Sequence, residues 1–130
     1  MALIEINGLT KIFGPHPHEA LALLKRGVSK EQLMERTGHG VGLRDVSLSI
    51  NEGEIFVIMG LSGSGKSTLV RCLNRLIEPT AGEILLRGKD VLALDAQGLR
   101  ALRQKTMAMV FQRFGLLPHR TVLDNIAYGL

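Results

Sequence analysis

The chain has 130 residues, of which 45% are hydrophobic and 22% charged, with a formal net charge of +4 and a pI near 9.6. This balance is typical of a globular protein and excludes a disordered tail, a collagen-like chain and a coiled coil. No uninterrupted apolar run is longer than that at Ile55–Met59, which is too short to span a bilayer as a helix, and the N-terminus lacks the pattern of a signal peptide.

The first 42 residues predict a strand followed by a helical insertion. Residues 2–9 have the apolar pattern of a short strand, and residues 10–15 are rich in turn formers. The insertion spans residues 15–42, where leucines recur at helical spacing up to Gly27. Within it, Ser29-x-x-Gln32 has the pattern of a capping box that opens a second short helix.

The next segment combines two kinds of strand with a glycine-rich loop. Residues 46–50 alternate apolar and polar side chains, as in a strand with one solvated face. Residues 54–59 show no alternation, which predicts a central strand of a parallel sheet covered on both faces. A glycine and serine loop follows at residues 60–65, and residues 66–76 have the apolar spacing of a helix that ends before Pro79.

The last third of the chain continues the mixture of strands and helices. Short strands are expected at residues 83–86 and 90–92, and Asp95 is placed to cap a helix that runs through Gln104. Residues 107–111 form another apolar strand pattern, and Thr121-x-x-Asp124 opens a further helix. The whole pattern predicts an α/β protein with a β-rich edge, central parallel strands and helices.

A motif for binding phosphates lies in the loop. Residues 60–67 match the pattern Gly-x-x-x-x-Gly-Lys-Ser/Thr, between a predicted strand and a predicted helix as this motif requires. Its glycines let backbone N–H groups approach phosphate oxygens, Lys66 supplies a positive charge, and Ser67 Oγ is a ligand for Mg²⁺. We therefore expect a nucleoside triphosphate with magnesium. The candidate binding residues are Gly60, Leu61, Ser62, Gly63, Ser64, Gly65, Lys66, Ser67 and Thr68.

Other interpretations of the loop and of the charge are weaker. A dinucleotide-binding loop needs Gly or Ala where Thr68 stands and gives the Lys-Ser pair no role, and the pattern and its context together disfavour a merely flexible polar loop. The basic excess lies after Gly98, where few aromatic residues accompany it, so we expect no nucleic-acid binding. The single cysteine, Cys72, cannot form an internal disulfide, which fits a reducing, cytoplasmic compartment.

Several segments together carry a family resemblance. They are residues 54–71, 73–80, 109–112, 117–119 and 121–125. In these segments the chain resembles the ATP-binding subunits of ABC transporters, in particular the glycine betaine and proline importer branch, and the helical insertion is a feature of that branch. The resemblance implies a P-loop NTPase fold of which residues 1–130 form the N-terminal part, including the strand, loop and helix of residues 54–76 and the strand and Q-loop of residues 107–120.

The resemblance also implies roles for two residues outside the loop. Phe13 resembles the aromatic residue that stacks on adenine, and Gln112 resembles the Q-loop glutamine that reaches Mg²⁺ and the γ-phosphate. The family's signature motif, the Walker B Asp with its catalytic Glu, and the switch His do not occur in these 130 residues. We therefore expect this stretch to bind ATP without turnover, while the complete subunit hydrolyses it.

The expected function follows from the same resemblance. The chain would be an ATP-binding subunit, or a fragment of one, that powers the uptake of glycine betaine, proline or a related compatible solute. Its partners would be a second copy of the subunit, transmembrane permease subunits and, indirectly, a substrate-binding protein, at the inner face of the plasma membrane. The alternatives are another ABC importer, such as an amino-acid importer, and a stand-alone P-loop phosphotransferase.

Overall fold

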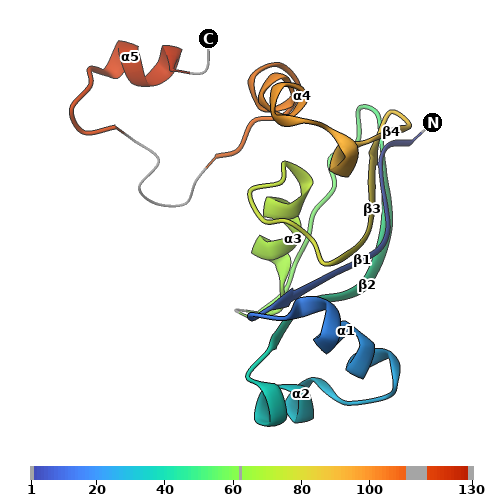
Figure 1. Cartoon of the computed structure of the whole chain (residues 1–130). Coiled ribbons are helices and arrows are strands. Elements are labelled where there is room, and N and C mark those ends of the chain that lie inside the picture. The colour runs from blue at the N-terminus through green and yellow to red at the C-terminus, as the bar shows by residue number, and fades with distance from the viewer. Residues whose placement is uncertain (1, 62, 111–116, 129–130) are drawn as a thin grey trace. The chain divides into compact units, whose positions relative to one another are not determined.

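The computed structural model describes residues 2–61, 63–110 and 117–128. The chain divides into two compact units, Met1–Ala93 and Leu94–Leu130, which are described one at a time (Figure 1). In neither unit does the described part of the chain include a helix with the length and apolar character needed to span a membrane.

A four-stranded antiparallel sheet organises the first unit. Its strands are β1 (Ala2–Phe13), β2 (Gly40–Asn51), β3 (Ala81–Leu86) and β4 (Lys89–Asp90), in the order β2-β1-β3-β4. The strand expected at residues 2–9 continues to residue 13, because β2 pairs with it as far as Phe13 opposite Gly40. The expected turn at residues 10–15 is therefore mostly strand. β2 shows the predicted alternation, with serines exposed between half-buried apolar residues at positions 46–50.

The helical insertion lies where β1 finishes and β2 begins (Figure 1). It consists of α1 (Pro17–Lys25) and α2 (Lys30–Thr37). The predicted capping box is confirmed, since Ser29 Oγ accepts a hydrogen bond from the Gln32 amide at 3.1 Å and the Gln32 side chain accepts one from the Ser29 amide at 3.2 Å. A small core of Ile12, Ala20, Leu24 and Leu33 joins both helices to β1.

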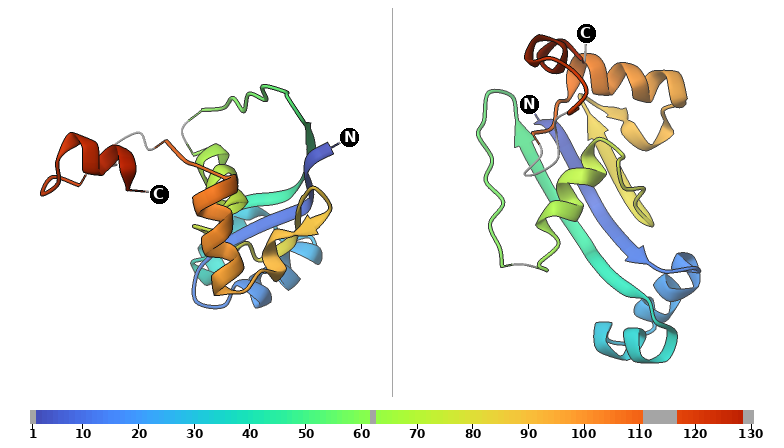
Figure 2. Two further views of the ribbon diagram at one scale, coloured as in Figure 1. Left: turned by 90° about the horizontal axis from the view of Figure 1, so that it is seen from above. Right: turned by 90° about the vertical axis from the view of Figure 1, so that its left-hand side faces the viewer.

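The third helix, α3 (Lys66–Leu73), lies against the sheet (Figure 2). It buries Leu69 and Cys72, as its apolar spacing predicts. The helix was expected to continue to residue 76, but Arg75 adopts a left-handed backbone conformation with φ of 58°, and Leu76 is 47% exposed. Arg75 is held there by an ion pair to Glu78 at 3.0 Å.

The predicted central strand at residues 54–59 is not formed in this structure. The segment is extended but has no sheet partner, and Ile55 and Met59 are 92% and 87% exposed. A strand without alternation is buried when layers such as helices cover both faces of its sheet, and residues 54–59 belong to no strand of the described sheet. The apolar side chains of a central strand are present in residues 54–59. The described residues do not supply the layers that would cover them.

Within residues 89–110 one expected helix is present, and two expected strands are not formed as predicted. Asp95 caps α4 (Ala96–Ala101) by accepting a hydrogen bond from the Gly98 amide at 2.7 Å, and the π-helical turn η2 (Leu102–Thr106) continues that helix. The strand expected at residues 90–92 is mostly the 3₁₀ turn η1 (Val91–Ala93), because pairing with β3 ends at Asp90. The strand expected at residues 107–111 has no regular structure up to Val110, and Phe111 lies outside the described residues.

The last described helix is α5 (Val122–Ala127), which begins where the sequence predicts. The Thr121 hydroxyl caps it by accepting a hydrogen bond from the Asp124 amide at 3.1 Å. The Asn125 side chain closes the preceding loop, since its Oδ1 accepts from the Leu117 amide at 2.8 Å and its Nδ2 donates to the Leu117 carbonyl at 3.2 Å. Side-chain hydrogen bonds, and not apolar burial, hold this end of the described chain.

The thiol of Cys72 gives a test of the packing of α3 on the sheet. The residue is fully buried, and burial raises the pKa of its thiol. Because the thiolate is the reactive form, both access and ionisation oppose alkylation. We expect iodoacetamide at pH 8 to label Cys72 at least about 100-fold more slowly in the folded protein than in urea, since labelling needs an opening that costs about 3 kcal/mol or more. Peptide mapping by mass spectrometry measures both rates, and equal rates would contradict the burial.

Candidate functional site

The loop before α3 is shaped by two glycines in the left-handed region. Gly63 has φ of 83° and Gly65 has φ of 91°, conformations that cost other residues free energy. Between them, the Ser64 amide donates a hydrogen bond to the Leu61 carbonyl at 3.1 Å, which closes a tight turn. Gly63 and Gly65 therefore have a backbone reason to be glycine.

The loop leads directly into the start of α3. Gly65 is the N-terminal cap residue, and its carbonyl accepts the first helical hydrogen bond from the Leu69 amide at 2.9 Å. The first amides of any helix have no partner within the helix, and they carry about half a positive charge. The Lys66 ammonium donates a hydrogen bond back to the Gly60 carbonyl, so it lies across the loop. The Lys66 ammonium and the partial positive charge at the start of α3 therefore lie at the same loop.

A close approach between two backbones fixes the loop against the sheet. A side-chain carbon added at Gly65 would overlap the carbonyl oxygen of Gly42 in β2 and would lie 3.2 Å from the Leu43 side chain. No residue larger than glycine fits at position 65 without moving the helix away from the strand. The start of α3 is therefore held directly on β2.

Phe13 is brought to the same place by the pairing of β1 with β2. A side-chain carbon added at Gly42 would lie 2.6 Å from Phe13 Cε2 and 3.3 Å from the Thr68 methyl group. The aromatic ring and the first turn of α3 thus meet over Gly42. The Lys11 ammonium lies 5.2 Å from the centre of the ring, and Phe13 is 44% exposed. An aromatic surface consequently stands beside the loop and is accessible to a ligand.

The structure brings most of the candidate residues together. Gly60, Leu61, Gly63, Ser64, Gly65, Lys66, Ser67 and Thr68 form one loop and helix start, with Phe13 adjacent to Thr68. Ser62 and Gln112 lie outside the described residues. Gly42 was expected to belong to the helical insertion, but β2 begins at Gly40, and a glycine inside a strand is a recognised signal of close backbone approach.

The groups at the loop determine which ligand it can hold. In the described ranges, no three His, Cys, Asp or Glu side chains converge to hold a metal by themselves. The exposed hydroxyl of Ser67, in the first turn of α3, can supply one oxygen, which suits Mg²⁺ that takes its other ligands from water and phosphate. The site is therefore suited to an anion that brings its own cation.

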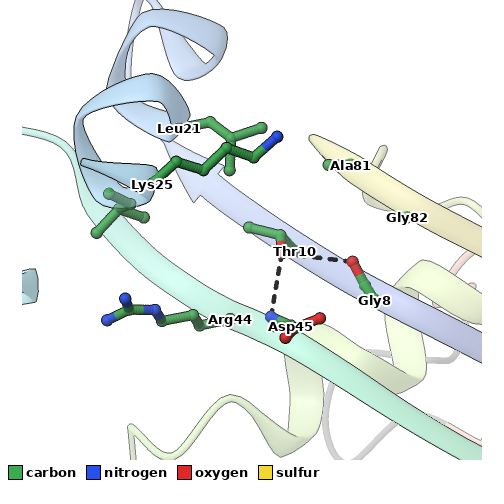
Figure 3. Close-up of a pocket in the computed structure, with 9 residues that line it drawn as sticks. Gly8, Thr10, Leu21, Lys25, Arg44, Asp45, Ala81 and Gly82 are labelled. Carbon is green, nitrogen blue, oxygen red and sulfur yellow. Dashed lines mark hydrogen bonds between the residues drawn. The ribbon is translucent and has the colours of Figure 1, made fainter. Parts of the chain in front are cut away.

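A separate pocket of about 470 Å³ lies elsewhere in the first unit (Figure 3). It is bordered by α1 and the strands, and Lys25, Arg44 and Asp45 are among its lining residues. At its floor the Thr10 hydroxyl accepts a hydrogen bond from the Asp45 amide at 3.0 Å. None of the described residues of the phosphate-binding loop lines this pocket.

Comparisons with known proteins agree with this geometry. The family model described as ABC transporter matches residues 43–128. The chain is 58% identical over 127 residues to the glycine betaine/proline betaine transport system ATP-binding protein ProV of Escherichia coli, covering 98% of this chain and 32% of that protein. It is 55% identical over 130 residues to the glycine betaine/carnitine transport ATP-binding protein GbuA of Listeria monocytogenes, covering 100% of this chain and 33% of that protein.

A solved structure extends the match to three dimensions. It is described as the dimeric structure of a post-hydrolysis state of the ATP-binding cassette MJ0796 bound to ADP and Pi, and its TM-score with this chain is 0.74 at 30% sequence identity. The match covers 97% of this chain and 46% of that chain. The chain thus spans about a third of the length of the curated relatives and less than half of this structure.

The two left-handed glycines of the loop provide a matched pair of variants. Gly63→Ala introduces only the backbone cost, because nothing lies within 4 Å of the added carbon, and we expect it to lower the free energy of unfolding by about 1 kcal/mol. Gly65→Ala adds the overlap with Gly42, and we expect a loss of about 3 kcal/mol or more. Urea titrations measure both, and equal losses would contradict the close approach of α3 to β2.

Proposed function

This chain belongs to the ABC transporter family, and from that premise we propose that residues 60–68 bind the phosphates of ATP while Phe13 stacks on its adenine ring. The observation that supports this most strongly is the meeting of Phe13 and Thr68 over Gly42. A base placed on Phe13 has the start of α3 beside it. The adenine ring and the phosphates of one nucleotide can therefore contact Phe13 and the start of α3, which lie next to each other.

Each group of the loop has a definite task in this proposal. The Lys66 ammonium exchanges its hydrogen bond to the Gly60 carbonyl for phosphate oxygens, so the loop holds the lysine close to where it acts. The backbone amides at the start of α3 donate to the phosphates, and the helix dipole favours their negative charge. Ser67 would supply a hydroxyl ligand to the magnesium ion that accompanies ATP, and such an ion would supply positive charge next to the phosphates. Gln112 is proposed as a second contact to that ion.

The proposal for the whole protein is an ATPase that drives import. Since the relatives are named as transport ATP-binding proteins for glycine betaine and proline betaine or carnitine, we propose glycine betaine, proline or a related compatible solute as the transported substrate. The site would be completed by a second copy of the subunit, as the dimeric ATP-binding cassette structure suggests. The protein would act with transmembrane permease subunits, and indirectly with a substrate-binding protein, at the inner face of the plasma membrane.

The role of Lys66 is tested by removing its charge. We expect Lys66→Ala to weaken the binding of Mg-ATP by about 10- to 100-fold, the loss typical of a charge-assisted hydrogen bond to a buried anion. Lys30→Ala removes the same charge from an exposed position at the start of α2 and should leave the affinity unchanged. Isothermal titration calorimetry measures the dissociation constants. Unchanged affinity in Lys66→Ala would exclude the loop as the nucleotide site.

An ATP hydrolysis assay tests whether residues 1–130 form only part of the proposed catalytic site. We expect residues 1–130 to bind Mg-ATP without steady hydrolysis, because this stretch has neither a Walker B carboxylate nor a signature motif. A coupled phosphate-release assay on this stretch and on a full-length relative such as ProV measures the difference. Steady turnover by residues 1–130 that disappears with Lys66→Ala would show that the stretch is catalytically complete and would contradict the proposal.

A further inference from the structure

A buried histidine joins the helical insertion to the turn that follows β1. His39 comes directly after Gly38, which ends α2, and it is only 5% exposed. Its Nε2 accepts a hydrogen bond from the backbone amide of His16 at 3.0 Å, and its Nδ1 lies 2.9 Å from the Thr37 hydroxyl. The ring therefore bridges the residue before α1 and the last turn of α2.

The hydrogen bonds determine where the proton of this imidazole lies. The Thr37 hydroxyl has one proton, which it donates to the Leu33 carbonyl at 2.6 Å. Its oxygen must then accept from Nδ1 of His39, as it does from the backbone amide of His39 at 3.3 Å. Nδ1 consequently carries the proton, and Nε2 is left as an acceptor for the His16 amide. Only the neutral ring with this tautomer satisfies every partner.

The same ring fixes the backbone next to Phe13. Gly14 has φ of 147°, and a side-chain carbon added there would overlap the His39 ring. The segment from Phe13 to His16 is thus held from one side by His39 and from the other by the packing of Phe13 on Gly42. His39 therefore contacts the backbone at Gly14, the residue next to Phe13, and at His16.

We propose that His39, as the neutral imidazole protonated on Nδ1, is a positioning residue for the purine of the bound nucleotide. It holds the turn at Gly14 and thereby the Phe13 ring, so that the helical insertion becomes part of the nucleotide site. The inference rests on the proposed function of Phe13 and the loop. It assigns to the insertion a task in recognising the base, separate from the recognition of the phosphates by the loop.

Two variants distinguish the effect of the hydrogen bond between His39 and the His16 amide from the effect of the size of the His39 side chain. His39→Leu keeps an apolar side chain and removes the acceptor for the His16 amide. His39→Gln can place its carbonyl oxygen near the position of Nε2. The affinity of Mg-ATP, measured beside that of Mg-tripolyphosphate, distinguishes the purine from the phosphates, since tripolyphosphate has no base.

At pH 8 we expect His39→Leu to bind Mg-ATP about 3- to 10-fold more weakly than the unchanged protein, the value of one lost hydrogen bond, with no change for tripolyphosphate. His39→Gln should remain within about 2-fold for both ligands. Calorimetric titrations on the full-length protein give all of these values.

Two results would overturn the inference: unchanged ATP affinity in His39→Leu, or equal losses for ATP and tripolyphosphate. Equal losses would mean that His39 only maintains the fold. Failure of the proposed function is recognised separately, because it would appear as ATP binding that survives Lys66→Ala, whatever the His39 variants show.

Discussion

Two glycines, Gly42 in β2 and Gly65 before α3, set the distance between the sheet and the phosphate-binding loop. The carbonyl of Gly42 occupies the space that a side chain at Gly65 would need, and the Phe13 ring occupies the space that a side chain at Gly42 would need. Each contact depends on the absence of a side chain. The close packing of β1, β2 and α3 therefore requires glycine at both positions 42 and 65. The aromatic surface, the strand and the helix start are therefore positioned by one stack of close contacts.

The helical insertion extends this arrangement to the far end of the sheet. Its apolar side chains pack on Ile12, one residue before the aromatic ring, and His39 ties its two ends to the turn beyond Phe13. The insertion is thus joined to β1 by an apolar contact on one side of Phe13 and by a hydrogen-bonded ring on the other. A segment that resembles a peripheral addition in the sequence is mechanically connected to the proposed adenine contact.

Local signals in the sequence predicted much of this, and non-local ones did not. The capping box at Ser29, the caps at Asp95 and Thr121 and the glycines of the loop all act within a few residues, so their patterns carry over directly into the structure. The extension of β1 to Phe13 depends on pairing with residues almost thirty positions away. The strand expected at residues 54–59 depends on neighbours that the described sheet does not supply. The role of Gly42 is visible only once Phe13 and Thr68 converge on it.

The central claim is that one nucleotide contacts both Phe13 and the loop of residues 60–68. Photolabelling of the full-length protein with 8-azido-ATP in the presence of Mg²⁺ tests both contacts at once, because the reactive group is on the base while binding depends on the phosphates. The account predicts that label is incorporated in the peptide that contains Phe13 and that Lys66→Ala abolishes it. Label confined to other peptides, or label at Phe13 that persists in Lys66→Ala, would contradict the account.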